Sequence, residues 1–337
     1  MEAESYFQKK GNLTNNMGLF KIFNTFKNYL RINLGIVDKY SGLEARAYEK
    51  PKRIDEIPHT EELRDVSHTH IYTNYRPQAN KWYLEQGFRN LAVLTRLTLK
   101  RGVNSLGITN FDDGNYEFWT SQSQLDSLPG SWKYFQDERL TVVITDKEEK
   151  IYFYKGEEIQ TSEGHVYFAG GKSGRENNIP HGRSLDDTLN EAEKEVCKDN
   201  PDRRVKMSSA DHAYGLLGIG KKATDEQKRR IDVYEWSGDF VQGTLGNKKA
   251  EKEATRLDKP LVTGEDSHRP KAVGRCYNIY DGRNLDYNSG ERFMASKREE
   301  TIKKKFVPVK RRGSLFASLH HMVMNTLYHW IFKETID

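Results

Sequence analysis

The chain has 337 residues, of which 36% are hydrophobic and 31% charged, enough for one large domain or two ordinary ones. Its net charge of +5, from 54 basic and 49 acidic residues, does not indicate a nucleic-acid coat, although it suits anionic substrates. Two cysteines can build neither a disulfide framework nor a thiolate zinc site, and no apolar run approaches a membrane span of roughly 18 residues. Without a recognisable secretion signal, we expect a cytoplasmic protein.

Three segments differ in character along the chain. Residues 1–60 are polar and rich in Asn, and predict an N-terminal extension. Residues 61–283 alternate short apolar runs with helix-like segments, and predict the main domain. Residues 284–337 contain a strongly basic stretch over 303–312 and an amphipathic helix expected over 314–332. We therefore expect a basic, amphipathic helical tail at the C-terminus.

Strands and helices are predicted to alternate within the main domain. Apolar runs predict strands at 63–66, 105–109, 140–145, 151–154, 166–169, 205–208, 231–236, 260–263 and 276–280. Helices are expected at 79–100, 185–198, 224–230 and 245–257, the second of them opened by a capping box of Ser184 and Asp187. Such alternation predicts an α/β protein with a largely parallel sheet, and this many units favour a closed or nearly closed barrel.

Histidines and acidic residues follow the predicted strands, where a parallel barrel places its active site. They are His68, His70, Glu157, Glu158, His165, Asp211, His212, Asp266 and His268. Imidazole and carboxylate ligands at successive strand ends suit zinc, manganese or iron, and one carboxylate can bridge two ions. Taken singly, each residue is more typical of a surface or of a satisfied buried group. Their joint order along the chain is what indicates a metal site.

Two segments near the start of the main domain resemble motifs of the polymerase and histidinol phosphatase (PHP) domain, a family of metal-dependent phosphoesterases. The first motif of the family, Asp-x-His-x-His, is similar to Asp65-Val-Ser-His68-Thr-His70, which has one extra residue. Its second motif, Ile-Thr-Asp-His-Asp, is similar to Ile108-Thr-Asn-Phe111-Asp. In that second motif, Phe111 takes the place of a histidine and cannot ligate a metal.

The later motifs extend the resemblance over roughly residues 63–282. Gly-x-Glu-Ile followed by a His-led strand resembles Gly-Glu-Glu158-Ile and His165, and the signature Gly-Ser-Asp-Ala-His resembles Gly-Glu-Asp266-Ser-His268. The resemblance implies a distorted (β/α)7-type barrel of the PHP kind, with the metals at the C-terminal mouth of the barrel. The last motif is the most specific of the set.

The resemblance also implies a set of ligands. The positions that match one metal are His68, His70, Glu158 and Asp266, and those that match a second are Glu158, His165 and His212, with Glu158 bridging. His268 matches a ligand of the third metal found in some members. Phe111, however, replaces the histidine that would ligate the same metal. We therefore expect two divalent ions (zinc, manganese or iron), and not three.

The expected activity is hydrolysis of a phosphate ester by a water that the two metals activate. The substrate would be a nucleotide, an oligonucleotide or a small phosphate ester. Asp266 and His268 are the candidate catalytic residues, His268 as proton donor or phosphate ligand, and Arg269 and His181 are candidates for substrate binding. For Arg269 and His181, solvated loop residues are the alternative interpretation.

A second function class stays open because of Phe111. The chain could be a weakened or repurposed PHP module that acts as a binding or scaffold protein, or that hydrolyses a non-phosphate bond. The basic C-terminal tail has three interpretations: packing on the barrel, contact with a phosphate backbone, or contact with a membrane surface. Glu235 follows a strand and is at least as readily structural, while Cys276 is expected to be a core thiol.

Overall fold

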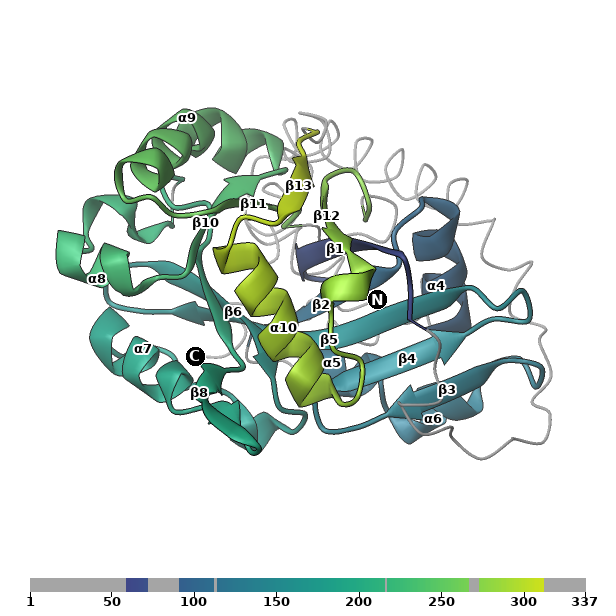
Figure 1. Cartoon of the computed structure of the whole chain (residues 1–337). Helices are drawn as coiled ribbons and strands as arrows, with labels where there is room; N and C mark the ends of the chain where they lie inside the picture. The colour runs from purple at the N-terminus through teal and green to yellow at the C-terminus, as the bar shows by residue number, and fades with distance from the viewer. Residues whose placement is uncertain (1–58, 72–90, 112–113, 216, 267–272, 312–337) are drawn as a thin grey trace, which may run out of the picture.

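The computed structural model describes residues 59–71, 91–111, 114–215, 217–266 and 273–311 of the chain (Figure 1). The described strands are β1 (Glu62–Thr69), β2 (Ser105–Asn110), β3 (Lys133–Gln136), β4 (Leu140–Ile144), β5 (Lys150–Gln160), β6 (His165–Gly171), β7 (Val196–Cys197), β8 (Asn200–Arg204), β9 (Met207–Ala210), β10 (Val233–Ser237), β11 (Leu261–Gly264), β12 (Tyr277–Asp281) and β13 (Phe306–Val309). The described α-helices are α4 (Leu91–Lys100), α5 (Asn115–Trp119), α6 (Gln122–Asp126), α7 (Leu185–Glu193), α8 (Asp225–Arg230), α9 (Phe240–Arg256) and α10 (Gly290–Ile302).

One large sheet organises the described residues. Its order is β11-β10-β9-β6-β5-β2-β1-β12-β13, with β4 paired to the first half of β5 and β3 paired to β4. The pairs β1/β2, β2/β5, β9/β10 and β10/β11 are parallel, as the βα pattern predicts.

The sheet is nevertheless mixed, and the expectation of a largely parallel sheet is wrong. β5 pairs antiparallel with β6, β6 with β9, and β12 with both β1 and β13. Only residues 161–164 join β5 to β6, a turn that Thr161 closes by donating from Oγ1 to the carbonyl of Gly164 (2.7 Å). So short a connection allows a hairpin but no crossover helix, so β6 must run back along β5.

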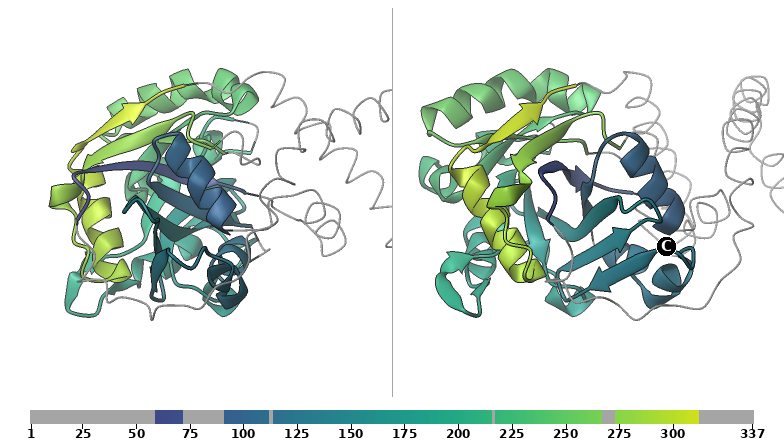
Figure 2. Two further views of the ribbon diagram at one scale, coloured as in Figure 1. Left: turned by 90° about the vertical axis from the view of Figure 1, so that its right-hand side faces the viewer. Right: turned by 45° about the vertical axis from the view of Figure 1, so that its right-hand side comes forward.

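The sheet curls until its two ends approach each other, which gives the nearly closed barrel that the sequence predicts (Figures 1 and 2). The side chain of Asn278 on β12 closes the seam to β11: its Oδ1 accepts the N–H of Thr263 (2.9 Å), and its Nδ2 donates to the Thr263 carbonyl (3.0 Å). The loop after β11 also contacts β1, because the N–H of Asp266 donates to the carbonyl of His68 (3.0 Å). A side-chain amide and a loop N–H thus connect β11 with β12 and β1, in place of the backbone hydrogen bonds of a strand pair.

Three apolar clusters hold the barrel together, and β5 shows how strand alternation feeds them. Tyr152 and Tyr154 face the cluster that also contains Phe293 of α10, whereas Ile151 and Phe153 face the cluster beneath α4. The third cluster packs α7 and α9 against β6, β9 and β10. Helices therefore cover the sheet on its outside, as Figure 2 shows, and the strand ends stay available for polar side chains.

Most predicted elements are confirmed within a few residues, with differences at their ends. Ser184 caps α7 by accepting the N–H of Asp187 (3.1 Å), as predicted, but α7 ends at Glu193 and is followed by the β7–β8 hairpin instead of further helix. The Thr224 side chain likewise opens α8, in a complete capping box with Gln227. The first part of the helix expected over 79–100, and the whole of that over 314–332, lie outside the described residues.

Helix α10 lies in the segment that the sequence assigns to a tail, yet it packs against the barrel. Its Lys297 is completely buried and forms an ion pair with Asp65 of β1 (2.7 Å). Lys297 also donates to the hydroxyl of Tyr154 (2.7 Å). Burial lowers the pKa of Lys297, and the carboxylate of Asp65 partly offsets the effect. Asp65, the first residue of the opening motif, is thus a structural anchor for α10.

The described part of the basic C-terminal stretch lies against acidic side chains of the same chain. Lys304 pairs with Asp258 (2.5 Å) and Lys310 with Glu251 (2.8 Å). Among the described residues, no helix is long and apolar enough to cross a membrane. Both cysteines are free and buried, and the thiol of Cys276 donates to the carbonyl of Gly264 (3.4 Å).

Candidate metal centre

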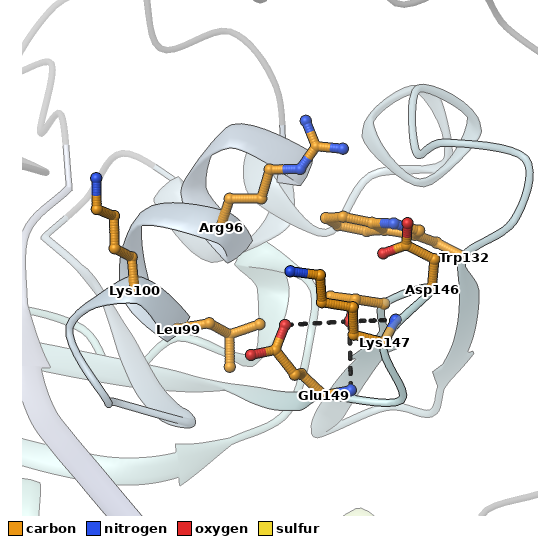
Figure 3. A pocket seen from close by; sticks show the side chains of 8 residues that line it. Arg96, Leu99, Lys100, Trp132, Asp146, Lys147 and Glu149 are labelled. Atoms are coloured by element: carbon orange, nitrogen blue, oxygen red, sulfur yellow. Dashed lines mark hydrogen bonds between the residues drawn. The ribbon is translucent and has the colours of Figure 1, made fainter.

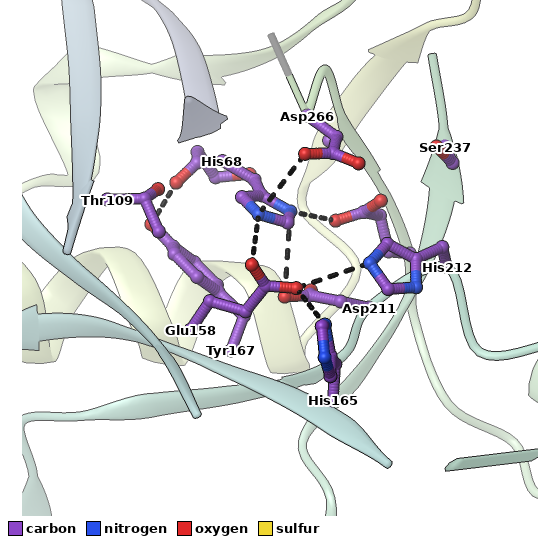
Figure 4. A network of polar contacts seen from close by, with 12 residues as sticks. His68, Thr109, Glu158, His165, Tyr167, Asp211, His212, Ser237 and Asp266 are labelled. Carbon is purple, nitrogen blue, oxygen red and sulfur yellow. Dashed lines mark hydrogen bonds and ion pairs between the residues drawn. The ribbon is translucent and has the colours of Figure 1, made fainter. Parts of the chain in front are cut away.

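Side chains from β1, β5 and β6, and from the residues that follow β1, β9 and β11, meet at the end of the barrel where the parallel strands finish (Figure 4). The predicted ligands found there are His68, His70, Glu158, His165, His212 and Asp266. His68 lies on β1, Glu158 near the end of β5 and His165 at the start of the antiparallel β6. Because β6 runs back from the same edge, its first residue lies beside the last residues of β5.

His68, His70 and Asp266 form the first group. The Nε2 atoms of His68 and His70 face each other at 2.9 Å, and the Oδ1 atom of Asp266 lies 4.0 Å and 3.9 Å from them. One donor atom of each residue lies within 4.8 Å of the others. All three side chains therefore aim at one point.

Glu158 connects this group with a second one. Its Oε1 atom lies 2.6 Å from Nδ1 of His165 and 3.2 Å from Nε2 of His212. Its Oε2 atom lies 2.9 Å from Nε2 of His70 and 3.9 Å from Nε2 of His68. Each carboxylate oxygen thus faces a different pair of imidazoles.

Burial and mutual contact shift the pKa values of these groups. Burial by itself would raise the pKa of Glu158, but the charge of His165 and the hydrogen bonds from His165, His212 and His70 hold it well below its usual value. For His68, burial acts to lower the pKa, and the carboxylates of Asp211 and Glu235 outweigh it and raise the pKa well above 6.5. In the absence of metal, these shifts favour an ionised Glu158 and a protonated His68.

A second row of residues fixes the orientation of His68. Its Nδ1 lies 2.9 Å from Oε2 of Glu235 and 3.5 Å from Oδ2 of Asp211, so Nδ1 donates and Nε2 is left for the site. The ring of Tyr167 stacks on the other side at 5.0 Å. A Cβ at Gly156 would approach the Tyr167 hydroxyl to 2.4 Å, which explains the glycine in that strand. The structural role expected of Glu235 is found.

The backbone at two of the predicted ligands lies in the left-handed region. His212 has a φ of 28° and Asp266 a φ of 45°, unusual values for residues other than glycine. Such conformations cost of order 1–3 kcal/mol and persist where the surroundings enforce them. The loops after β9 and β11 therefore hold both side chains toward the site at the expense of backbone energy.

Glu157 is buried, not solvated. It points away from the predicted metal ligands, as strand alternation requires. There its Oε1 lies 3.5 Å from Nζ of Lys155 and its Oε2 lies 3.3 Å from Nζ of Lys206. Glu117 and Glu195 complete the network at 3.0 Å from Lys155 and 2.7 Å from Lys206. The alternation of Lys155 and Glu157 within an apolar strand was the available signal.

The other predicted residues fall at the edge of the centre or outside the described part of the chain. The ring of Phe111 lies 5.8 Å from that of His165 and 4.9 Å from that of His181. His181 accepts the N–H of Gln160 at its Nδ1 (3.2 Å). His268 and Arg269 lie outside the described residues.

A separate hollow lies at the other end of the strands (Figure 3). It has a volume of about 330 Å³ and lies between the end of α4 and the turn from β4 to β5. The guanidinium of Arg96 covers the ring of Trp132 there, 5.0 Å from its centre, and Lys147 and Glu149 line the turn. Because Glu149 precedes β5 and Glu158 lies near its end, the hollow is remote from the metal centre.

The donor set fits a divalent transition metal. Four imidazoles and two carboxylates supply only nitrogen and oxygen, in groups whose donor atoms lie within 4.8 Å of one another. Among the six, only Asp266 is more than slightly exposed. The Glu235–His68 contact is the second-sphere bond that metal-ligating histidines commonly make. The group of His68, Glu158 and Asp211 offers a further arrangement around the same histidine.

Comparison with known proteins gives one family match. Residues 244–300, from α9 to α10, match a family model described as PHP-associated. No curated protein matches the sequence. The crystal structure of PsfC from Pseudomonas syringae is 13% identical with a TM-score of 0.49, and covers 81% of this chain and all of its own. A candidate metal-dependent phosphoesterase from Bifidobacterium adolescentis is 12% identical with a TM-score of 0.34, over 67% of this chain and 92% of its own. These two likenesses are too weak to carry an argument.

Proposed function

We propose that the chain is a metal-dependent phosphoesterase of the PHP-domain kind with two divalent ions, and the match of residues 244–300 to a family model described as PHP-associated supports this proposal. His68, His70, Asp266 and Glu158 would hold one ion, and Glu158, His165 and His212 the other. Zinc, manganese and iron all suit nitrogen and oxygen ligands of this kind. A nucleotide, an oligonucleotide or a small phosphate ester is the proposed substrate.

One observation carries this proposal: the position of Glu158. Its Oε1 faces His165 and His212, while its Oε2 faces His70, at 2.6, 3.2 and 2.9 Å. A carboxylate whose two oxygens serve two sets of imidazoles is suited to bridge a pair of ions. A carboxylate with a purely structural role would need only one partner for each oxygen. It would not need three histidines close to it.

The ions would supply an acidified water as nucleophile and would neutralise charge on the phosphoryl oxygens. The chain contributes orientation: Glu235 holds the Nδ1 proton of His68, and Tyr167 stacks behind the same ring. The carbonyl of His68 accepts the N–H of Asp266 and so fixes the loop that carries this carboxylate. Because these groups are already fixed, little reorganisation is needed when a phosphate ester binds.

The alternative is a PHP module that has lost hydrolysis and serves binding. The second motif favours it, since the side chain of Asn110 is engaged in structure: its Oδ1 accepts the N–H of Tyr116 (2.7 Å), and its Nδ2 donates to Glu117 (2.7 Å). Phe111 follows directly. Neither residue is available to a third ion.

The test combines metal analysis with turnover. Protein loaded with manganese or zinc should contain about two ions per chain and hydrolyse a generic aryl phosphate or phosphodiester. Glu158→Gln, which keeps the size of the side chain, should lose metal and turnover together. Glu226→Ala, at an exposed carboxylate on α8, is the control. Two bound ions without turnover of any phosphate ester would favour the binding module, and three tightly held ions would contradict the two-ion site.

A further inference from the structure

An aromatic wall, formed by Phe111 and His181, lies beside the predicted metal ligands. The ring of Phe111 lies 5.8 Å from that of His165, itself in contact with Glu158. The ring of His181 meets Phe111 edge to face, at 4.9 Å and an interplanar angle of 78°. Such pairs are a favoured aromatic geometry. The wall thus borders the place where a phosphate ester would bind.

Hydrogen bonds of the neighbouring backbone help to position both residues of the wall. Asn110 ties the end of β2 to the start of α5 through the N–H of Tyr116, and this places the next residue, Phe111, at the mouth. His181 is held by the N–H of Gln160 at the end of β5. The backbone at the ends of β2 and β5 therefore positions both rings in advance.

Resting on the proposed function, we propose that Phe111 is a specificity-determining residue that stacks against a planar aromatic ring in the substrate. The metal ions would bind the phosphate, which is common to all phosphate esters. The partly exposed phenyl ring of Phe111, beside their ligands, offers an apolar face to the organic group of the ester. The preferred substrate is a phosphate ester that carries a nucleobase or an aryl ring, over one with only a sugar or alkyl group.

His181 serves this contact as a positioning residue. Its ring meets Phe111 edge to face and limits how that ring can turn. Its own anchor is a backbone N–H of β5, two residues beyond Glu158. The orientation of Phe111 is thus coupled to the strand that carries the bridging carboxylate.

The experiment compares a nucleoside 5′-monophosphate with ribose 5-phosphate on the metal-loaded full chain. The two share the scissile phosphate and the leaving oxygen and differ in the base alone. The ratio of their kcat/KM values should fall in Phe111→Ala by roughly 5- to 150-fold, the range of one base stacked on an aromatic side chain. The ratio should fall less in Phe111→Leu. Phe118→Ala, which removes an exposed ring on α5, should keep the wild-type ratio. An unchanged ratio in Phe111→Ala overturns the proposal.

A binding measurement keeps this inference separate from catalysis. Phenylphosphonate and cyclohexylphosphonate are similar in size and cannot be hydrolysed, but only the first has a planar ring. Calorimetry on the metal-loaded protein should show tighter binding of phenylphosphonate, and Phe111→Ala should reduce that preference. If neither the nucleotide nor ribose 5-phosphate is hydrolysed but phenylphosphonate binds more tightly than cyclohexylphosphonate, the phosphoesterase proposal fails. The stacking role of Phe111 is then still supported. Equal binding of both phosphonates would overturn the wall.

His181→Asn tests the positioning role. Asparagine can still accept the N–H of Gln160 but has no ring edge for Phe111. The thermal midpoint should stay near wild type while the nucleotide-to-sugar ratio falls. A variant that loses thermal stability and keeps the ratio would show His181 to be structural only.

Discussion

At the scale of single residues, neighbouring acids on β5 have opposite duties. Glu158 faces four imidazoles of the candidate metal centre, and Glu157 faces two buried lysines on the other side of the strand. The adjacent glutamates look alike in sequence. What separates them is the alternation of the strand combined with what each face meets in the folded barrel.

Glu157→Ala should destabilise the fold without removing metal. The substitution leaves Lys155 and Lys206 with one carboxylate fewer, and breaking a buried pair costs about 3–5 kcal/mol. Denaturant unfolding should show this loss, whereas the metal content of the folded fraction should match wild type. A mild effect on stability together with a loss of metal would mean that Glu157, and not Glu158, faces the metal site.

His268→Ala tests the proton donor that the sequence indicates. General acid catalysis typically contributes a factor of about 10² to 10⁴. Turnover should therefore fall by that order with two ions still bound, and less for esters with a good leaving group. If metal is lost in proportion to activity, His268 is a ligand and the two-ion assignment needs revision.

At the scale of elements, α10 shows how a charged segment can be part of a core. The helix has weak amphipathic character, and its charged sequence predicts a tail. Nevertheless its Phe293, Met294 and Ala295 are buried against the barrel, and Lys297 reaches Asp65. The lysine ammonium also lies 3.9 Å from the centre of the Tyr154 ring. A buried ion pair thus adds to three buried apolar side chains in fixing a helix whose apolar periodicity is poor.

Lys297→Met should destabilise the protein by about 3–5 kcal/mol, because it keeps the volume of the side chain but leaves Asp65 as an unpaired buried charge. Asp65→Asn added to Lys297→Met should recover much of that loss. Chemical denaturation of the single and double variants measures both effects. Additive losses would show that the two side chains act independently and not as a pair.

At the scale of the whole molecule, metal and protons compete for one set of imidazoles. The carboxylates around His68 raise its pKa well above 6.5 against the effect of burial. Burial also acts to lower the pKa of His212, but the hydrogen bond and charge of Glu158 raise it above its usual value. In metal-free protein, protonation of these histidines contributes stability that is present below pH 6.5 and is lost as the pH rises through their folded pKa values. A histidine must be in its neutral form to ligate a metal, so binding of an ion would release these protons.

Stabilisation by metal should therefore grow with pH. We expect the difference in thermal midpoint between manganese-loaded and chelated protein to increase from pH 6 to pH 8. Calorimetric titration in buffers of different ionisation enthalpy should show protons released per ion, fewer at higher pH. In His212→Ala, both the released protons and the pH dependence should decrease. A difference that is constant with pH would contradict protonation of these ligands.

The sequence by itself determined the alternating elements, the position of most strands and the set of histidines and carboxylates at their ends. These follow from local rules: apolar periodicity, capping residues such as Ser184, and side chains placed where strands finish. Such signals lie within a few residues of one another, so they can be recognised before folding.

Only the tertiary structure decided which strands run antiparallel, where the barrel closes and what each buried charge contacts. Asn278 closes the seam with Thr263, 15 residues away in sequence. Lys297 reaches Asp65 from 232 positions further along the chain. Neither pairing leaves a periodic signal. Both arise because a buried polar group must find a partner wherever the curled sheet offers one, and that choice depends on the whole fold.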